Sequence, residues 1–156
     1  FHATVHVWIF SEKGNVLIQK RSTKKKLNPG IWDVSVAGHV EYKEDIKAAA
    51  IRETFEETGI HIKEKDLLKL GIYTSESNHS KIIDREFQYT YILKIDEVKI
   101  NLNYKNDEVD ALKLISLEEM DFLLNQNNRD IFIGKNKNYY KNVFEAILEI
   151  TKDNYQ

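Results

Sequence analysis

The alternation of apolar and polar residues along the chain predicts several β-strands. Residues 4–10 alternate, and a turn signal at residues 13–15 is followed by a hairpin partner at residues 16–20. Short apolar or alternating runs predict further strands at residues 33–37, 68–74, 86–95 and 111–115. The predicted strands are therefore spread over most of the chain, and segments without this alternation separate them.

Helical spacing marks those other segments. Residues 45–58 lack Gly and Pro and are rich in Ala, Glu, Lys and Ile, and Gly59 is a natural helix stop. Ser116 followed by Glu119 is a capping box, which predicts a helix through about Leu124. Residues 140–150 have the spacing of an amphipathic C-terminal helix.

Together these elements predict the fold class. Strands with helices on both faces indicate an α/β/α sandwich with a mixed sheet. The apolar pattern runs without a break through 156 residues, so we expect a single domain over residues 1–156.

The helix at residues 45–58 has two distinct faces. One face carries small and apolar residues followed by acids, namely Ile46, Ala49, Ala50, Glu53, Glu56 and Glu57. The opposite face, with Ala48, Ile51 and Phe55, is expected to pack on a core. Both sides of this helix are therefore predicted to be covered.

The three glutamates lie where a helix tolerates them poorly. The negative end of the helix dipole disfavours each carboxylate by some tenths of a kcal/mol, roughly, and the acids repel one another at spacings of three and four residues. A solvated acidic helix end is one interpretation. A hard divalent cation with oxygen ligands, Mg²⁺ or Mn²⁺, would relieve the repulsion and is the interpretation that we prefer.

The acids belong to a longer frame of fixed residues. Residues 38–60 read GHVEYKEDIKAAAIRETFEETGI, with the spacing G-x5-E-x7-R-E-x-x-E-E-x-G. The fixed positions are charged or glycine, so burial periodicity does not explain them. This run resembles the Nudix box, the signature of hydrolases that cleave nucleoside diphosphates linked to another moiety. Thr54 departs from the aliphatic residue usual there.

The resemblance implies a role for each fixed residue. Glu53, Glu56 and Glu57 would ligate Mg²⁺, and one of them is a candidate base. Gly38 would allow a tight turn and offer its carbonyl to the metal. Arg52 would orient the glutamates by charge-assisted hydrogen bonds, and Glu44 would pair with Arg52. The implied chemistry is attack of metal-activated water on a phosphorus of a diphosphate.

Composition narrows the class of protein. The net charge of −2 argues against nucleic acid as a bulk electrostatic partner. The basic run at residues 24–26 is either a solvated loop or a phosphate-steering element. The absence of cysteine excludes disulfides and a thiol nucleophile, and we see neither a bilayer-spanning stretch nor a secretory signal. We therefore expect a cytoplasmic protein, and the resemblance to the Nudix box implies a small-molecule diphosphate substrate.

A second resemblance runs from Phe1 to about Glu119. FHATVHVWIFSEKGNVLIQKRSTKKKLNPGIWDVSVAGHV is similar to the N-terminal half of isopentenyl-diphosphate isomerases, which belong to the same superfamily. Those isomerases use a cysteine just before the box glycine, where this chain has Ala37, and their box is degenerate, whereas this one keeps all three glutamates. Both differences favour hydrolysis over isomerisation.

The isomerase resemblance also points to residues outside the box. His2 and His39 match two metal-binding histidines, and Asp84 and Glu86 match a downstream acid pair. The alternatives are a frayed terminus for His2 and a loop residue facing the substrate for His39. Glu86 is a candidate ligand or base. Glu108 is the rival base, because many Nudix hydrolases place a glutamate in the loop before the last strand, or it is a solvated loop acid.

Candidate substrate contacts come from the neighbouring strands. Lys20 and Arg21 end a strand and would contact the diphosphate or lie in solvent. Trp32 would stack on a base or, in the interpretation that we prefer, pack as an anchor beside a turn. Aromatic residues that would line a substrate pocket or belong to the core are Tyr73, Phe87 and Tyr89.

Three functions follow from these patterns. We favour a Mg²⁺-dependent diphosphohydrolase that acts on a nucleotide or another organic diphosphate. A non-catalytic domain that senses a diphosphate is the alternative, and an isomerase is a weaker third. The intact set of Arg52, Glu53, Glu56 and Glu57 favours the enzyme, because a sensor has no need of a triple carboxylate.

Overall fold

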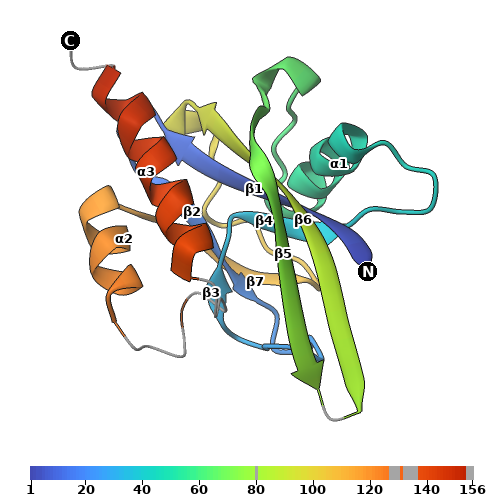
Figure 1. The fold of residues 1–156 in the computed structure, drawn as a ribbon. Coiled ribbons are helices and arrows are strands. Elements are labelled where there is room, and N and C mark those ends of the chain that lie inside the picture. The colour runs from blue at the N-terminus through green and yellow to red at the C-terminus, as the bar shows by residue number, and fades with distance from the viewer. Residues whose placement is uncertain (80, 127–130, 132–136, 154–156) are drawn as a thin grey trace.

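The computed structural model describes residues 1–79, 81–126, 131 and 137–153. A mixed sheet forms its centre, in the order β3-β2-β1-β6-β5, with β4 paired to β1 and β7 paired to β2 (Figure 1). The strands are β1 (His2–Ser11), β2 (Val16–Arg21), β3 (Trp32–Asp33), β4 (Val36–His39), β5 (Leu68–His79), β6 (Ile82–Ile95) and β7 (Val109–Ile115). β1 and β6 run parallel, and the other pairs are antiparallel.

Helices cover both faces of this sheet. α1 (Ile46–Thr58) lies on one side, and α2 (Leu117–Leu124) and α3 (Lys137–Asp153) lie on the other (Figure 1). Two single-turn helices, η1 (Glu64–Asp66) and η2 (Glu97–Lys99), follow α1 and β6. The predicted α/β/α sandwich with a mixed sheet is confirmed.

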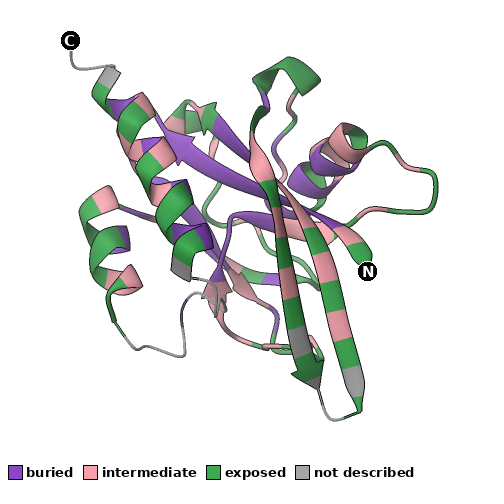
Figure 2. Cartoon of the chain, viewed as in Figure 1, coloured by how far each residue is buried: buried purple, intermediate pink, exposed green. Residues whose placement is uncertain are grey.

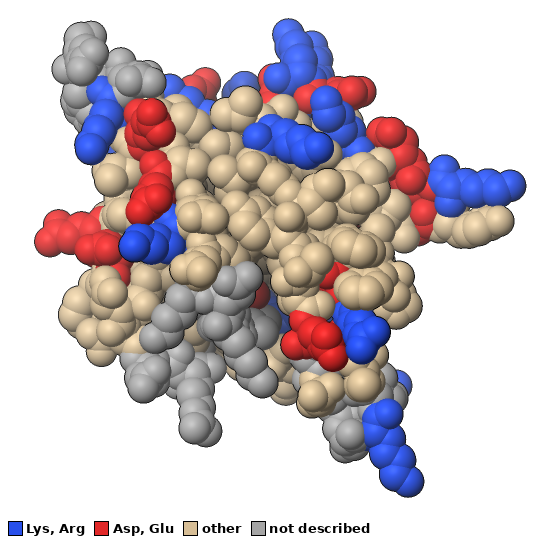
Figure 3. Space-filling view, viewed as in Figure 1, with Lys and Arg blue, Asp and Glu red and all other residues tan. Residues whose placement is uncertain are grey.

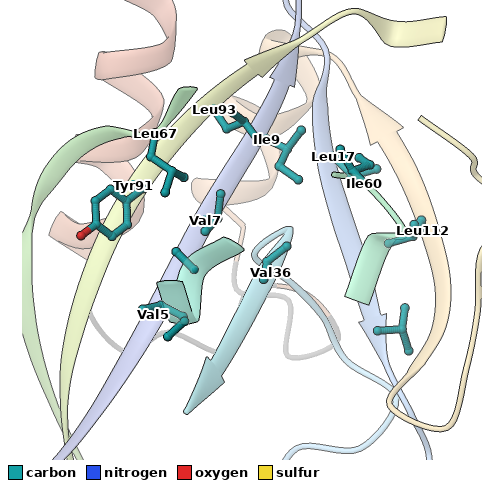
Figure 4. Close-up of a cluster of buried hydrophobic side chains, with 13 residues drawn as sticks. Val5, Val7, Ile9, Leu17, Val36, Ile60, Leu67, Tyr91, Leu93 and Leu112 are labelled. Carbon is teal, nitrogen blue, oxygen red and sulfur yellow. The ribbon is translucent and has the colours of Figure 1, made fainter. Parts of the chain in front are cut away.

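The alternation of β1 divides the core into two layers. Val5, Val7 and Ile9 point toward α1 and pack with its buried alanines in the first cluster (Figure 4). Trp8 and Phe10 point the other way and pack with α2 and α3 in the second cluster. β1 is therefore almost wholly buried, as its colour in Figure 2 shows.

One predicted strand is wrong. Residues 33–37 do not form one strand, because the chain changes partner within them: β3 pairs with β2, whereas β4 pairs with β1. Ser35 fixes the break, since its hydroxyl accepts a hydrogen bond from the Ile9 amide at 2.8 Å. The strands expected at 68–74 and 86–95 exist but are longer, and they form one long hairpin (Figure 1).

The ends of α1 agree with the sequence, but one of its faces does not. The Asp45 carboxylate accepts a hydrogen bond from the Ala48 amide at 3.1 Å, and Gly59 ends the helix with φ of 76°. The expected cover over the second face is found only at Ile51, which is half-buried and packs against the first core cluster, whereas Ala48 is exposed and Phe55 is 45% exposed and stacks on His61. α1 is an outer layer, so its fully buried residues lie on its sheet-facing side.

The remaining helices match their signals. The Ser116 hydroxyl caps α2 by accepting from the Glu119 amide at 3.0 Å, and α3 begins earlier and ends later than residues 140–150. None of the helices in the described part of the chain has the length and apolar character needed to cross a membrane. On the face shown in Figure 3, acidic and basic side chains are interspersed around a mostly uncharged centre.

Candidate active site

Arg52 is the centre of the charged network on α1. Its Nε and Nη2 donate to the two carboxylate oxygens of Glu44 at 2.8 and 2.9 Å, which confirms the expected pair. Its Nη1 donates to Glu53 at 2.8 Å and to Glu56 at 3.1 Å, and Nη2 also reaches the His39 carbonyl at 3.0 Å. The hydrogen bonds from Arg52 lower the pKa of Glu44 to about 2, so this carboxylate stays charged.

Glu57 is a buried carboxylate, only 3% exposed. Its Oε1 accepts hydrogen bonds from the Gln19 side-chain amide and from the Ala37 backbone amide, the latter at 3.1 Å. Burial raises the pKa of Glu57 well above its usual range, and repulsion from Glu53 adds to that rise. The Glu57 carboxylate is therefore shielded from solvent. No lysine or arginine among the described residues forms an ion pair with it.

Gln19 is a residue that the sequence analysis did not single out. It lies on β2 and is buried, and its amide also donates to the Ser35 carbonyl at 2.9 Å. A usable signal exists in the sequence: Gln19 falls two residues after Leu17, so it is a polar residue on the apolar face of a strand. Such a residue needs a buried partner, which here is Glu57.

Glu53 lies directly over Gly38. It is 7% exposed, and burial raises its pKa, as does repulsion from Glu56. A Cβ on Gly38 would lie 2.6 Å from Glu53 Cγ and closer still to its carboxylate. The tight turn expected at Gly38 is wrong, because the residue lies within β4 opposite Val5. Glycine is needed there to admit the Glu53 side chain.

Glu108 completes a group of three carboxylates. One oxygen from each of Glu53, Glu57 and Glu108 lies within 4.8 Å of the other two. Glu56 lies outside this group and is exposed. Glu86 is outside it as well, on β6, where it pairs in register with His2. Of the two candidate bases outside the helix, Glu108 therefore lies beside the buried glutamates and Glu86 does not.

The other candidate residues lie at the first or last positions of strands. Trp32 packs against the second core cluster, and Lys113 Nζ lies 4.4 Å from its ring centroid. Arg21 donates to the Leu27 carbonyl at 3.2 Å. The exposed rings of His39 and His2 meet edge to face, 6.2 Å apart.

The basic run also lies beside the acidic loop. Lys24 Nζ is 3.9 Å from Asp107, and Lys25 Nζ is 4.0 Å from Glu108. The Ser22 amide donates to the Glu108 carbonyl at 3.0 Å, which joins the two segments through the backbone. The lysines are thus placed at the edge of the three-carboxylate group.

Comparison with protein families is decisive here. The model of the NUDIX domain matches residues 1–133 of this chain. The chain belongs to the Nudix family. An uncharacterized Nudix hydrolase of Clostridium acetobutylicum is 31% identical over 176 residues, which cover 96% of this chain and 85% of that protein.

Two further relatives fit the same family. The isopentenyl-diphosphate Delta-isomerase 2 of Photorhabdus laumondii is 32% identical over 132 residues, covering 84% of this chain and 71% of that protein. The crystal structure of the MutT protein from Methanosarcina mazei Go1 superimposes with a TM-score of 0.71 over 97% of this chain and 95% of that one, at 22% identity. Family and fold together support a Nudix hydrolase function.

Proposed function

We propose that this Nudix domain is a hydrolase dependent on Mg²⁺ or Mn²⁺ that cleaves a diphosphate linkage in a nucleotide or another organic diphosphate. The observation that carries the proposal is the group formed by Glu53, Glu57 and Glu108. Three carboxylates so close together, two of them buried, fit a hard divalent cation, because burial and mutual repulsion both disfavour their charge without one.

Different residues orient the carboxylates, bind the metal and act as the base in this proposal. Arg52 orients Glu53 and Glu56, and the amides of Gln19 and Ala37 orient Glu57. A bound divalent ion supplies polarisation of phosphoryl oxygens and a water of lowered pKa. In this proposal Glu53, Glu56, Glu57 and the Gly38 carbonyl are ligands. Glu108, whose carboxylate lies within the same group, is a further ligand or the preferred base, with Glu86 as the alternative base.

The substrate would approach from the side of the basic run. Lys24 and Lys25 lie next to the Glu108 loop and would attract phosphate oxygens. Arg21, Trp32 and His39 are the further residues that we assign to substrate contact.

One observation favours isomerisation as a second candidate, namely the isomerase relative in Photorhabdus laumondii. Against it, Ala37 occupies the position before the box glycine, and the chain contains no cysteine. The proton transfer that depends on that thiol therefore lacks its group.

A substrate panel tests the proposal. Phosphate and pyrophosphate release would be assayed with Mg²⁺ on nucleoside diphosphates, sugar nucleotides, dinucleotides and isoprenoid diphosphates. We expect turnover of at least one, lost in Glu57→Gln and kept in Glu149→Gln, which removes an exposed charge on α3. Tight binding of one compound without any turnover would indicate a sensor, and conversion of isopentenyl diphosphate to its isomer would indicate an isomerase.

A further inference from the structure

The C-terminal end of α1 is hydrogen-bonded to the loop at residues 101–108, mainly through the Glu56 carbonyl oxygen and more weakly through the Phe55 carbonyl, which accepts from Tyr104 Oη at 3.5 Å. The Glu56 carbonyl accepts hydrogen bonds from Tyr104 Oη and from Asn106 Nδ2, both at 2.7 Å. The Tyr104 ring also covers Gly59, where a Cβ would lie 3.0 Å from it. The last carbonyls of a helix lack partners within the helix, so the loop supplies the missing donors.

Asn106 reaches in the opposite direction as well. Its Oδ1 accepts from the backbone amides of Glu108 at 2.8 Å and of Val109 at 3.0 Å, and the Asn106 backbone amide donates to the Val109 carbonyl at 3.0 Å. The Glu56 carbonyl belongs to the peptide group that precedes Glu57. One side chain therefore connects the peptide of Glu57 to the backbone of Glu108.

This connection opposes a force that acts on the loop. Glu108 is exposed, and one of its carboxylate oxygens lies within 4.8 Å of oxygens of Glu53 and Glu57, so like-charge repulsion pushes it away from the helix whenever these carboxylates are ionised. The contact with Lys25 at 4.0 Å is long and partly exposed, and such pairs contribute little. Asn106 has both the contacts and the position to hold Glu108 in place.

We propose that Asn106 is a positioning residue that sets the separation between Glu108 and the buried glutamates, and thereby the affinity of the site for a divalent cation. The inference rests on the proposed function in so far as it takes these carboxylates as the metal site. Tyr104 shares the Glu56 carbonyl, but in the described part of the chain its hydroxyl bonds to Phe55, Glu56 and Asn106 and not to Glu108, so it serves as the comparison.

The critical variant is Asn106→Asp, studied by Mn²⁺ titration without substrate. The aspartate keeps an oxygen that can accept from the Glu108 and Val109 amides, but it lacks the Nδ2 group that donates to the Glu56 carbonyl. Loss of an outer partner of a ligand typically costs about 10- to 100-fold in metal affinity, and we expect a loss in that range. An added negative charge alone would strengthen cation binding, so Asn103→Asp, at an exposed position of the same loop, controls for charge. Tyr104→Phe should change the affinity much less.

Two readouts separate positioning from a general effect on folding. In the metal-free protein, Asn106→Ala should speed hydrogen exchange at the Glu108 and Val109 amides and leave exchange in β1 unchanged. In a Glu108→Gln background, Asn106→Asp should lower Mn²⁺ affinity no further, because the residue acts through Glu108.

Unchanged Mn²⁺ affinity in Asn106→Asp, or an equal loss in the Glu108→Gln background, would overturn the inference while leaving hydrolysis by the wild type intact. Absence of turnover on every substrate, with the Asn106 effect on Mn²⁺ binding present, would overturn only the proposed function.

Discussion

The side chain of Glu53 covers the α-carbon of Gly38 so closely that a methyl group there would lie 2.6 Å from Glu53 Cγ. The two residues come from different elements, β4 and α1, and their contact sets how near the acidic end of the helix lies to the sheet. The glycine at the start of the box and the first of its clustered glutamates are therefore one structural unit.

Gly38→Ala tests this contact. The added methyl group would push Glu53 away from Glu57 and Glu108, and we expect hydrolysis to fall about 100-fold, because small misplacements of a catalytic group have effects of that size. The cost in stability should be about 1–3 kcal/mol, as for other overpacked sites. Gly71→Ala is the control, since its Cβ would meet Tyr73 at an ordinary 3.5 Å. Equal activity of the two variants would contradict the assignment.

Glu57→Gln should separate stability from function. Burial raises the pKa of Glu57, so its charge opposes folding, whereas a glutamine keeps an oxygen for the Gln19 and Ala37 amides. We expect metal binding to be lost and the free energy of unfolding in EDTA to rise by about 0.5–2 kcal/mol, the range of single stabilising substitutions. Urea unfolding at pH 8 measures the change, and a less stable variant would show that the charge is already compensated.

Arg52→Lys should weaken the site although the charge is kept. A lysine ammonium cannot reproduce the two-pronged bond to Glu44 while also reaching Glu53 and Glu56. We expect activity and Mn²⁺ affinity to fall about 10- to 100-fold. Arg85→Lys is matched to it, because Arg85 makes an exposed ion pair with Glu76 at 3.5 Å and lies over the Phe1 ring, without contact to the glutamates of α1 among the described interactions of the chain, and it should behave as the wild type.

His6 should make stability depend on pH. It is buried with Nδ1 2.6 Å from Tyr139 Oη, and burial, together with the charge of Arg21, lowers its pKa to about 4. The unfolded chain takes up this proton near pH 6.5 and the folded chain does not. His6 therefore destabilises the protein progressively as the pH falls from 6.5 toward 4, by up to about 3 kcal/mol.

His6→Gln isolates this contribution. Urea unfolding of both proteins between pH 4 and 8 gives the difference in unfolding free energy. Relative to the variant, the wild type should lose stability below pH 6.5 and show no further change above it. Parallel curves would mean that His6 accepts its proton in the folded state. Asp33, whose pKa burial raises to about 6, titrates in the same window and is present in both proteins, so its effect cancels in the difference.

Much of the helix α1 could be predicted because its signals are local. The cap at Asp45, the stop at Gly59 and the pairing of Glu44 with Arg52 depend on residues within one short segment. The break between β3 and β4 and the exposure of Phe55 were not predicted, since each depends on which element packs next to that segment.

The sequence by itself determined the family, the sandwich and the residue types of the site, because the box fixes charged residues at spacings that a helix brings together. The tertiary structure decided which distant residues join them. Glu108 rather than Glu86 lies close to Glu53 and Glu57, and Gln19 on β2 donates a hydrogen bond to Glu57. These contacts depend on how β2, β6 and the loop before β7 are placed around α1, and no local spacing encodes that placement.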